Sequence, residues 1–458
     1  MPTKRRALAE RREIVGHSQE TLVRIVGVEP TTVGRWERGE TSPQPRARPK
    51  LADALTVSVA VLDAMLAEGQ PAEVEQAAGR EPRPAGEWTS DLDHDPVLAP
   101  PWNHRGTLES AVVLSEGDRV KRRTFVFLTG MALTAPAHQW LVHEPGPLVS
   151  GLSGCRVSAG LVDRLTAMIA ELRTMDDVAG GGMMLSLAEQ EFRVVAMLLD
   201  QASYDEATGR KLHGALAELG RLAGYGAYDS GQPGLAQRYN IAALRAAHTI
   251  NDRPLGAHIL GFMAYQATRQ ERPAEAVTLI ETALTGIRGR ETPALLAELY
   301  GWQADAFATL GDGPGCTAAM SKARTQIEYL SPDDDLPYLY WVSPGEITAY
   351  AGQCLLQLGH TGEAITFLDD GISLLGESFT RDRQAYLIHM AGALVQPGTQ
   401  RDLDAAVSRG MEAIDIAESL HSTYSVDLLR GLCDQMKPHT NVPAVRDFVG
   451  RARELVTV

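Results

Sequence analysis

The chain has 458 residues, enough for two or three domains, and its 44% hydrophobic and 22% charged residues are ordinary for a globular protein. Its four cysteines, Cys155, Cys316, Cys354 and Cys433, form no CxxC pair and have no cluster of His beside them, which argues against a zinc site or a disulfide framework. The first ten residues lack an apolar signal core and no stretch reaches the roughly 20 apolar residues of a membrane span, so we expect a cytoplasmic protein without membrane contact.

Charge is unevenly distributed along the chain. Residues 1–66 hold 11 Lys and Arg against 8 Asp and Glu, whereas the remainder holds 32 against 50 and gives the chain its net charge of −15. A basic N-terminal region on an acidic body fits a nucleic-acid-binding head whose body does not lie on DNA. The positive excess is small, and chance composition is the alternative reading.

Four regions follow one another along the sequence. Residues 1–67 have the pattern of five short helices, and residues 68–104 form a proline-rich linker in which Trp102 is placed to dock on a neighbouring domain. Residues 105–157 form a connecting segment with a buried helix. From residue 158 to 458 the pattern is helical and rich in Ala and Leu, so we predict an all-α fold.

Several helix starts in the last region are marked by capping residues. Ser158 is placed to cap the first helix. Further starts are predicted at Ser186 with Glu189 as a capping box, and at Thr292-Pro293 and Ser343-Pro344, where Pro takes the first helical position.

A frame of one turn residue and two small residues recurs along the helical region. The small residues follow the turn residue after five and twelve positions. The frames are Gly231-Ala236-Ala243, Glu271-Ala276-Ala283, Gly311-Cys316-Ala323, Gly359-Ala364-Gly371 and, more weakly, Arg401-Ala406-Ala413. Such a frame describes a helical hairpin whose second helix crosses the first closely, and stacked hairpins form an α-solenoid.

This frame resembles the tetratricopeptide repeat family over about residues 210–420, although the repeats are longer than that family's usual length of about 34 residues. An unrelated helical bundle is the alternative. In the family, the first helix of each hairpin lines a concave groove. The resemblance therefore implies groove side chains at Arg221, Tyr225, Tyr228, His258, Tyr265, Glu298, Asp305 and Gln353. Aromatic groups beside charges suit a small molecule, peptide or protein, but they are also ordinary in helix packing.

Peptide-pheromone receptors of Gram-positive bacteria share the layout of a DNA-binding head and a repeat body. They commonly clamp the peptide backbone with Asn. This chain has only four Asn, among them Asn240 in the early repeats. The composition therefore weakens the peptide reading and leaves a small molecule or a protein partner.

The stretch Ser18–Gly39 is the most informative part of the sequence. Ser18 can cap one short helix, Gly27 permits a sharp turn, and Glu29-Pro30 opens a second helix that Gly39 ends. Buried side chains are expected at Leu22, Ile25, Val26, Val33 and Trp36. Two short helices across a tight turn have helix-turn-helix geometry, with the outer face of the second helix in the DNA major groove.

The pattern Gly-Val-x-x-x-Thr-Val-x-x-Trp-Glu-x-Gly of residues 27–39 resembles the Cro-like, or phage-repressor, helix-turn-helix family over about residues 5–66. The combination with a tetratricopeptide-like body resembles regulators of actinobacteria. By resemblance, Arg12 and Glu37 form an internal ion pair. The implied DNA contacts are Gln19 and Thr32 to the backbone, Thr31 and Arg35 to bases, Arg38 nearby, and Arg46 and Arg48 to phosphate or the minor groove.

Three residues depart from that family's pattern. Pro30 stands where relatives often read a base, Gly34 weakens its helix by about 1 kcal/mol, and His17 replaces an apolar residue. A degenerate head that packs against the body without binding DNA is therefore the alternative.

Two other motifs have simpler interpretations. Arg122-Arg123 and the following apolar residues look like a twin-arginine export motif, with Ala135-Pro136-Ala137 as a cleavage site, but a folded head precedes them, so we predict a buried helix. Gly180-Gly181-Gly182 is predicted to be a loop and not a phosphate cradle. No nucleophile and base stand at a recognisable spacing, so we expect no enzyme activity, no catalytic residue, no cofactor and no metal.

Together these features predict a cytoplasmic, homodimeric transcriptional regulator. It would bind double-stranded DNA through its head, and its repeat domain would mediate dimerisation and bind an unknown small molecule, peptide or protein. The alternative is a tetratricopeptide-type interaction scaffold whose head is vestigial.

Overall fold

In the computed structural model the chain forms two compact units, Met1–Pro84 and Ala85–Val458. The structure describes residues 12, 17–38, 41, 43, 50–51, 54–55, 66, 95–115, 127–146, 148, 151–152, 154–175, 181–331, 336–376, 379–418 and 423–456.

The first unit contains two described helices, α2 (Gln19–Val26) and α3 (Thr32–Glu37). α3 begins later than predicted, because Pro30 lies in the turn before it. Ile25 is 47% exposed and not buried, because Leu22 and Val26, one turn apart, occupy the buried side of α2. The apolar core comprises Leu22, Val26, Val33, Trp36, Leu51, Leu55 and Leu66. Most of the residues behind the five-helix prediction lie outside the described part.

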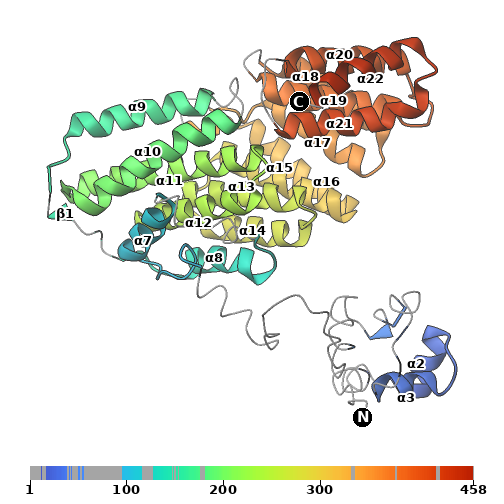
Figure 1. Cartoon of the computed structure of the whole chain (residues 1–458), viewed down its shortest axis with the longest axis horizontal. Coiled ribbons are helices and arrows are strands. Elements are labelled where there is room, and N and C mark those ends of the chain that lie inside the picture. Colours follow the sequence, from blue (N-terminus) through green and yellow to red (C-terminus); the bar gives the residue numbers. More distant parts are fainter. Residues whose placement is uncertain are drawn as a thin grey trace, which may run out of the picture. The chain divides into compact units, whose positions relative to one another are not determined.

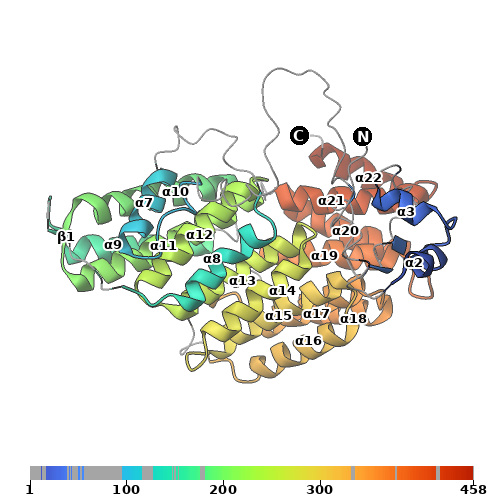
Figure 2. The same ribbon diagram turned by 90° about the horizontal axis from the view of Figure 1, so that it is seen from below.

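The second unit is a long series of paired helices, seen from two directions in Figures 1 and 2. The helices are α9 (Ala159–Met175), α10 (Gly181–Gln201), α11 (Glu206–Asp229), α12 (Pro233–Thr249), α13 (Arg253–Arg269), α14 (Pro273–Gly286), α15 (Pro293–Leu310), α16 (Gly313–Ile327), α17 (Pro344–Gln357), α18 (Thr361–Leu374), α19 (Thr380–Val395), α20 (Leu403–Ala417), α21 (Thr423–Met436) and α22 (Pro443–Val456). From α11 onward, each odd-numbered helix packs on the even-numbered helix that follows it.

Small elements complete this unit. Strand β1 (Gly151–Leu152) pairs antiparallel with β2 (Ser203–Tyr204), and Gly151 lies opposite Tyr204. Two 3-10 turns, η2 (Pro337–Leu339) and η3 (Lys437–His439), connect helices. Within the described residues, no helix is long and apolar enough to cross a membrane.

The predicted hairpin turns are confirmed for the four stronger frames. Their turn residues Gly231, Glu271, Gly311 and Gly359 have left-handed φ values of 73°, 59°, 74° and 82°. The small residues that follow lie buried on the second helix of each pair. At Gly371 a Cβ atom would lie only 2.4 Å from the Ala349 backbone nitrogen, so α18 crosses α17 at backbone contact. The small side chains therefore set the spacing within the helix pairs.

Residues 95–103, which the sequence analysis assigned to the linker, pack against α12. Asp95 and Arg238 form a buried ion pair at 3.0 Å. Arg245 donates to the Leu98 carbonyl at 2.7 Å, and its guanidinium lies 4.7 Å from the centre of the Trp102 ring. The packed unit therefore includes the end of the predicted linker, and Trp102 docks as expected.

Two further helices, α7 (His104–Ser115) and α8 (Met131–Val142), pack on α10, α12 and α14. The predicted buried helix at the twin-arginine motif lies mostly outside the described residues. Leu128, at its end, is not helical, because the Gln237 amide pairs with its backbone N–H and carbonyl at 2.7 and 3.0 Å. Pro136 and Ala137 of the supposed cleavage site are buried within α8.

The start of α10 corrects two sequence predictions. The helix begins at Gly181, so Gly181 and Gly182 form its first turn and not a loop, and Ser186 lies inside the helix instead of capping it. The buried side continues through Met184, Ala188 and Phe192 at four-residue spacing, and this packing carries the helix back past Ser186. The other three predicted caps are present, since Ser158, Thr292 and Ser343 each accept a hydrogen bond from a first-turn backbone N–H.

Candidate functional site

The turn between α2 and α3 is built from local capping interactions. The Ser18 hydroxyl accepts a hydrogen bond from the Thr21 N–H at 3.1 Å and so caps α2. Gly27 ends α2 with a left-handed φ of 77°, and its N–H donates to the Val23 carbonyl at 2.9 Å. These contacts fix the angle at which α3 leaves the turn.

Beneath α3, a buried network of polar side chains connects separate parts of the head. Arg12 Nε donates to Glu37 Oε1 at 2.6 Å, and both side chains are about 90% buried, so the internal ion pair implied by the resemblance is confirmed. Gln19 Nε2 donates to Glu37 Oε2 at 2.5 Å. Gln19, predicted to contact the DNA backbone, therefore also positions the carboxylate that links α2 to α3.

The outer side of α3 carries most of the described DNA-contact candidates. Thr31, Arg35 and Arg38 are exposed and Thr32 is half-buried. Gly34 is buried, and a Cβ there would lie 3.1 Å from Arg38 Nη1 and 3.3 Å from Gln19 Oε1. Gly34 thus leaves room for the neighbouring side chains. The sequence by itself indicated only that a glycine weakens the helix at this position. Arg46 and Arg48 lie outside the described residues.

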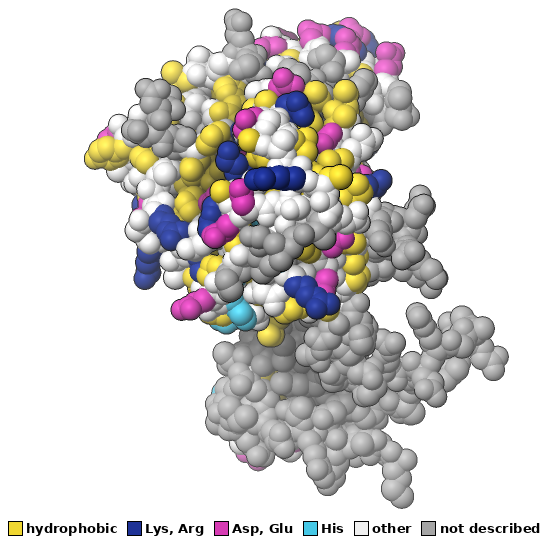
Figure 3. All heavy atoms as spheres, turned by 90° about the vertical axis from the view of Figure 1, so that its left-hand side faces the viewer, with side chains coloured by type: hydrophobic (Ala, Val, Ile, Leu, Met, Phe, Trp, Pro, Cys, Tyr) yellow, Lys and Arg dark blue, Asp and Glu magenta, His cyan; other side chains and the backbone are white. Residues whose placement is uncertain are grey.

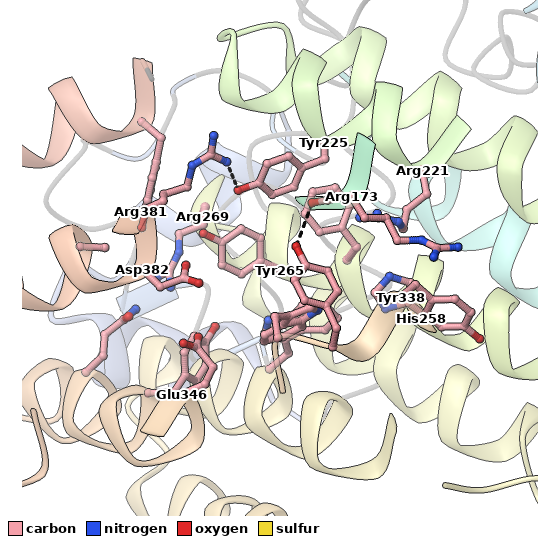
Figure 4. A pocket seen from close by; sticks show the side chains of 18 of the residues that line it. Arg173, Arg221, Tyr225, His258, Tyr265, Arg269, Tyr338, Glu346, Arg381 and Asp382 are labelled. Atoms are coloured by element: carbon pink, nitrogen blue, oxygen red, sulfur yellow. Dashed lines mark hydrogen bonds between the residues drawn. The ribbon is translucent and has the colours of Figure 1, made fainter. Parts of the chain in front are cut away.

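The second unit contains a pocket of about 140 Å³, shown in Figure 4. Its wall is formed mainly by the first helices of successive pairs. The lining residues are Arg173, Arg221, Tyr225, His258, Phe262, Tyr265, Arg269, Trp302, Tyr338, Tyr340, Trp341, Glu346, Tyr350, Gln353, Arg381, Asp382, Ala385, Tyr386 and Tyr424. The volume has room for roughly ten water molecules, so a small organic molecule fits it.

Five of the eight predicted groove residues line this pocket, namely Arg221, Tyr225, His258, Tyr265 and Gln353. The other three lie behind the lining and support it. Tyr228 packs on the Tyr265 ring at 6.1 Å, Glu298 contacts His258, and Asp305 forms an ion pair with Arg269.

Some pocket residues that were not predicted, such as Phe262 and Arg269, lie on the same helices as predicted ones. Others lie elsewhere: Arg173 is in the last turn of α9, Tyr338 and Tyr340 lie in and beside η2, and Arg381 and Tyr424 lie on the late helices. A dense aromatic run, Tyr338-Leu339-Tyr340-Trp341, was the one available signal. Long-range contacts bring these groups in, because Arg381 donates to the Tyr225 hydroxyl and the Tyr340 hydroxyl donates to the Arg173 carbonyl at 2.8 Å.

Aromatic rings form much of the pocket wall. The Phe262 and Tyr265 rings stack with centres 6.0 Å apart, and Tyr265 lies 6.1 Å from Trp302. The guanidinium of Arg269 lies 5.1 Å from the centre of the Tyr265 ring, and that of Arg381 lies 5.2 Å from the centre of Tyr225. Such a wall favours a flat apolar group.

The arginines of the pocket are supported by carboxylates. Arg173 Nε donates to Glu218 Oε2 at 2.9 Å. Arg269 pairs with Asp305 at 3.3 Å. The Gln353 amide also lies against the Arg269 guanidinium, with its oxygen as acceptor. Each guanidinium has five N–H donors, so hydrogen bonds to one protein partner do not use all of them.

Burial shifts the pKa of ionisable side chains near the pocket. Burial raises the pKa of Glu298 well above its usual value, and lowers that of His258, whose Nδ1 lies 2.8 Å from Glu298 Oε1. Both shifts disfavour the charged form of the side chain concerned. Burial and nearby Asp382 also raise the pKa of Glu346, which accepts from the Tyr386 hydroxyl at 2.6 Å.

The body surface seen in Figure 3 mixes charges of both signs. Lys and Arg side chains alternate with Asp and Glu over the described part of this face. It therefore lacks the uniform positive field that attracts a DNA backbone.

Comparison with known proteins identifies the head. Residues 5–65 match the family model described as "Helix-turn-helix domain". A search of curated proteins gives no match. The chain thus carries an N-terminal helix-turn-helix domain, which indicates DNA binding, followed by a large helical region, and no catalytic family was found.

Proposed function

We propose that this protein is a sequence-specific transcriptional regulator whose helical body binds a ligand. The first part of this proposal, sequence-specific regulation, rests on the helix-turn-helix head, with a buried ion pair beneath α3 and Arg35 on its exposed side. The second part, ligand binding by the body, rests on the pocket, which is lined by residues from seven helices.

In the proposed complex, α3 lies in the major groove. Thr31 and Arg35 contact base edges, and Arg35 can make two hydrogen bonds to one guanine. Thr32, Gln19 and Arg38 take backbone-facing positions, and Arg46 and Arg48 neutralise phosphates. We further propose that the protein acts in the cytoplasm as a homodimer on a two-fold DNA site, as helix-turn-helix proteins commonly do.

The body is proposed to be a tetratricopeptide-like solenoid. The left-handed turn residues and buried small residues of the repeat frame support this reading, as does the pocket on the first helices of the pairs. A ligand changes DNA affinity only if it prefers one of two body states. Some contacts span the pocket, such as the one between Arg381 and Tyr225. A ligand can change the distance between the residues that such a contact joins.

The second candidate function is a protein-interaction scaffold with a vestigial head. It is favoured by the acidic body and by Pro30 at a position where relatives read a base. The two functions differ in one measurable property, which is sequence-specific binding of DNA by the full chain.

The test begins with duplexes selected by the purified full-length protein from a random pool. Replacing Arg35 by Ala should cost roughly 1–3 kcal/mol on the selected duplex and relax preference at one base pair per half-site. Arg105→Ala is the matched control, because it removes the same charge from an 87% exposed position on α7. Failure to select any sequence, or equal binding by Arg35→Ala and the wild type, would favour the scaffold.

A further inference from the structure

The two ends of the pocket differ in how their arginines are engaged. His258 and Arg269 line it from opposite ends of one side of α13, eleven residues and therefore about 16 Å apart. At the Arg269 end, Arg269 and Arg381 lie over tyrosine rings, and Asp305 and Asp229 lie beside their guanidiniums.

Two further arginines, Arg173 and Arg221, line the His258 end of the pocket. Arg173 uses Nε and Nη2 on Glu218, which leaves the two N–H donors of Nη1. Arg221, one turn before Tyr225 on α11, lies beside His258 in Figure 4. Charge from Arg221 and Arg173 adds to burial in lowering the pKa of His258, which reports a positive potential at this end.

A buried polar atom at the same end is a second, independent observation. His258 is 2% exposed, and its Nε2 has no hydrogen-bond partner among the described residues. Buried polar atoms are almost always satisfied, so a hydrogen-bonding group is expected near this ring.

The space between the two ends suits a ring. Phe262 and Tyr265 stack along α13, and Trp302 lies within 6.4 Å of His258 and 6.1 Å of Tyr265, measured between ring centres. A flat group against this wall gains apolar burial and ring contacts without ordering a long chain.

We propose that the pocket binds a small aromatic carboxylate, with its anionic group at Arg173 and Arg221 and its ring against Phe262, Tyr265 and Trp302. This proposal rests on the ligand-binding role proposed for the body and names the class of ligand. A carboxylate is planar and accepts paired N–H donors, which a guanidinium supplies in matching geometry. Glu346 and Asp382 lie away from this end, as Figure 4 shows.

The test uses three probes with the same ring system and different charge. Isothermal titration calorimetry on the full-length protein would compare 2-naphthoate, neutral 2-naphthamide and cationic 2-naphthylmethylammonium. We expect naphthoate to bind at least tenfold more tightly than the amide and the ammonium to bind most weakly. Equal binding of acid and amide, stronger binding of the ammonium, or no binding at millimolar concentration would overturn the proposal.

Variants locate the carboxylate. Arg221→Met and Arg173→Met should each weaken naphthoate at least tenfold while changing naphthamide little, because Met keeps an apolar stem and loses the donors. Arg210→Met is the control, since this arginine lies on α11 with a 53% exposed side chain and is not a lining residue. An unchanged naphthoate affinity in both pocket variants refutes the assigned end, and the acid–amide comparison in wild type needs no variant to fold.

Binding to the selected duplex, measured on the same preparations, keeps this inference separate from the proposed function. Loss of naphthoate binding with intact DNA selection contradicts only the ligand class. Absence of DNA selection with intact naphthoate binding contradicts only the regulator.

Discussion

The close crossing of α17 and α18 predicts that Gly371→Ala destabilises the body. The added methyl group would lie 2.4 Å from the Ala349 nitrogen, 2.6 Å from its Cα and 2.6 Å from its Cβ. Two of these atoms belong to the backbone, so no side chain can turn away to make room, and α17 and α18 must separate. Overpacking of this kind costs roughly 1–3 kcal/mol.

The measurement is the thermal unfolding midpoint from circular dichroism, and we expect it to fall on the order of 2–6 °C. Because α17 carries Glu346, Tyr350 and Gln353 into the pocket, naphthoate affinity should fall as well. Gly362→Ala is the control on the same helix, since its nearest atoms, in Gln400, lie 3.8 Å away. That substitution should leave the midpoint unchanged or raise it, because Ala favours helix over Gly by about 1 kcal/mol. If Gly371→Ala unfolds no earlier than Gly362→Ala, the close crossing of α17 and α18 is wrong.

Two further predictions concern pH and the head. Burial lowers the pKa of His213 from 6.5 to about 4. As pH falls, the unfolded chain therefore takes up this proton before the folded chain does. The stability that neutral His213 contributes is lost between about pH 6.5 and 4. Wild type should therefore lose on the order of 2 kcal/mol more than His213→Gln between pH 7.5 and 5, and parallel unfolding midpoints of the two proteins would contradict this. Gly27→Ala forces a side chain into a φ of 77° and should cost about 1 kcal/mol of head stability, read as faster amide hydrogen exchange in α2 and α3 and weaker DNA binding. Gly27→Asn should be milder, because Asn tolerates the left-handed region, and equal exchange in Ala and Asn variants would count against the turn geometry.

Features that depend on near neighbours in the chain were predictable from the sequence. The turn at Gly231 and its counterparts, the caps at Thr292 and Ser343, and the buried Val33 and Trp36 all follow from residue type and helical spacing. Each is decided by backbone freedom, one local hydrogen bond or one side of a helix, so a short window of sequence contains the cause.

Only the tertiary structure shows which other residues come together to form the pocket. Arg381 and Tyr225 are 156 residues apart, and Tyr340 and Arg173 are 167 apart, yet each pair is in contact. Helical spacing assigns a residue to one side of its helix but fixes neither the curvature of the stacked pairs nor the helix end that reaches the groove. The same limit explains the start of α10, where packing along Met184, Ala188 and Phe192 extended the helix past a well-formed capping pattern at Ser186. Burial of an apolar surface is worth more than a single cap, and it is the packed neighbours that determine how much surface is buried.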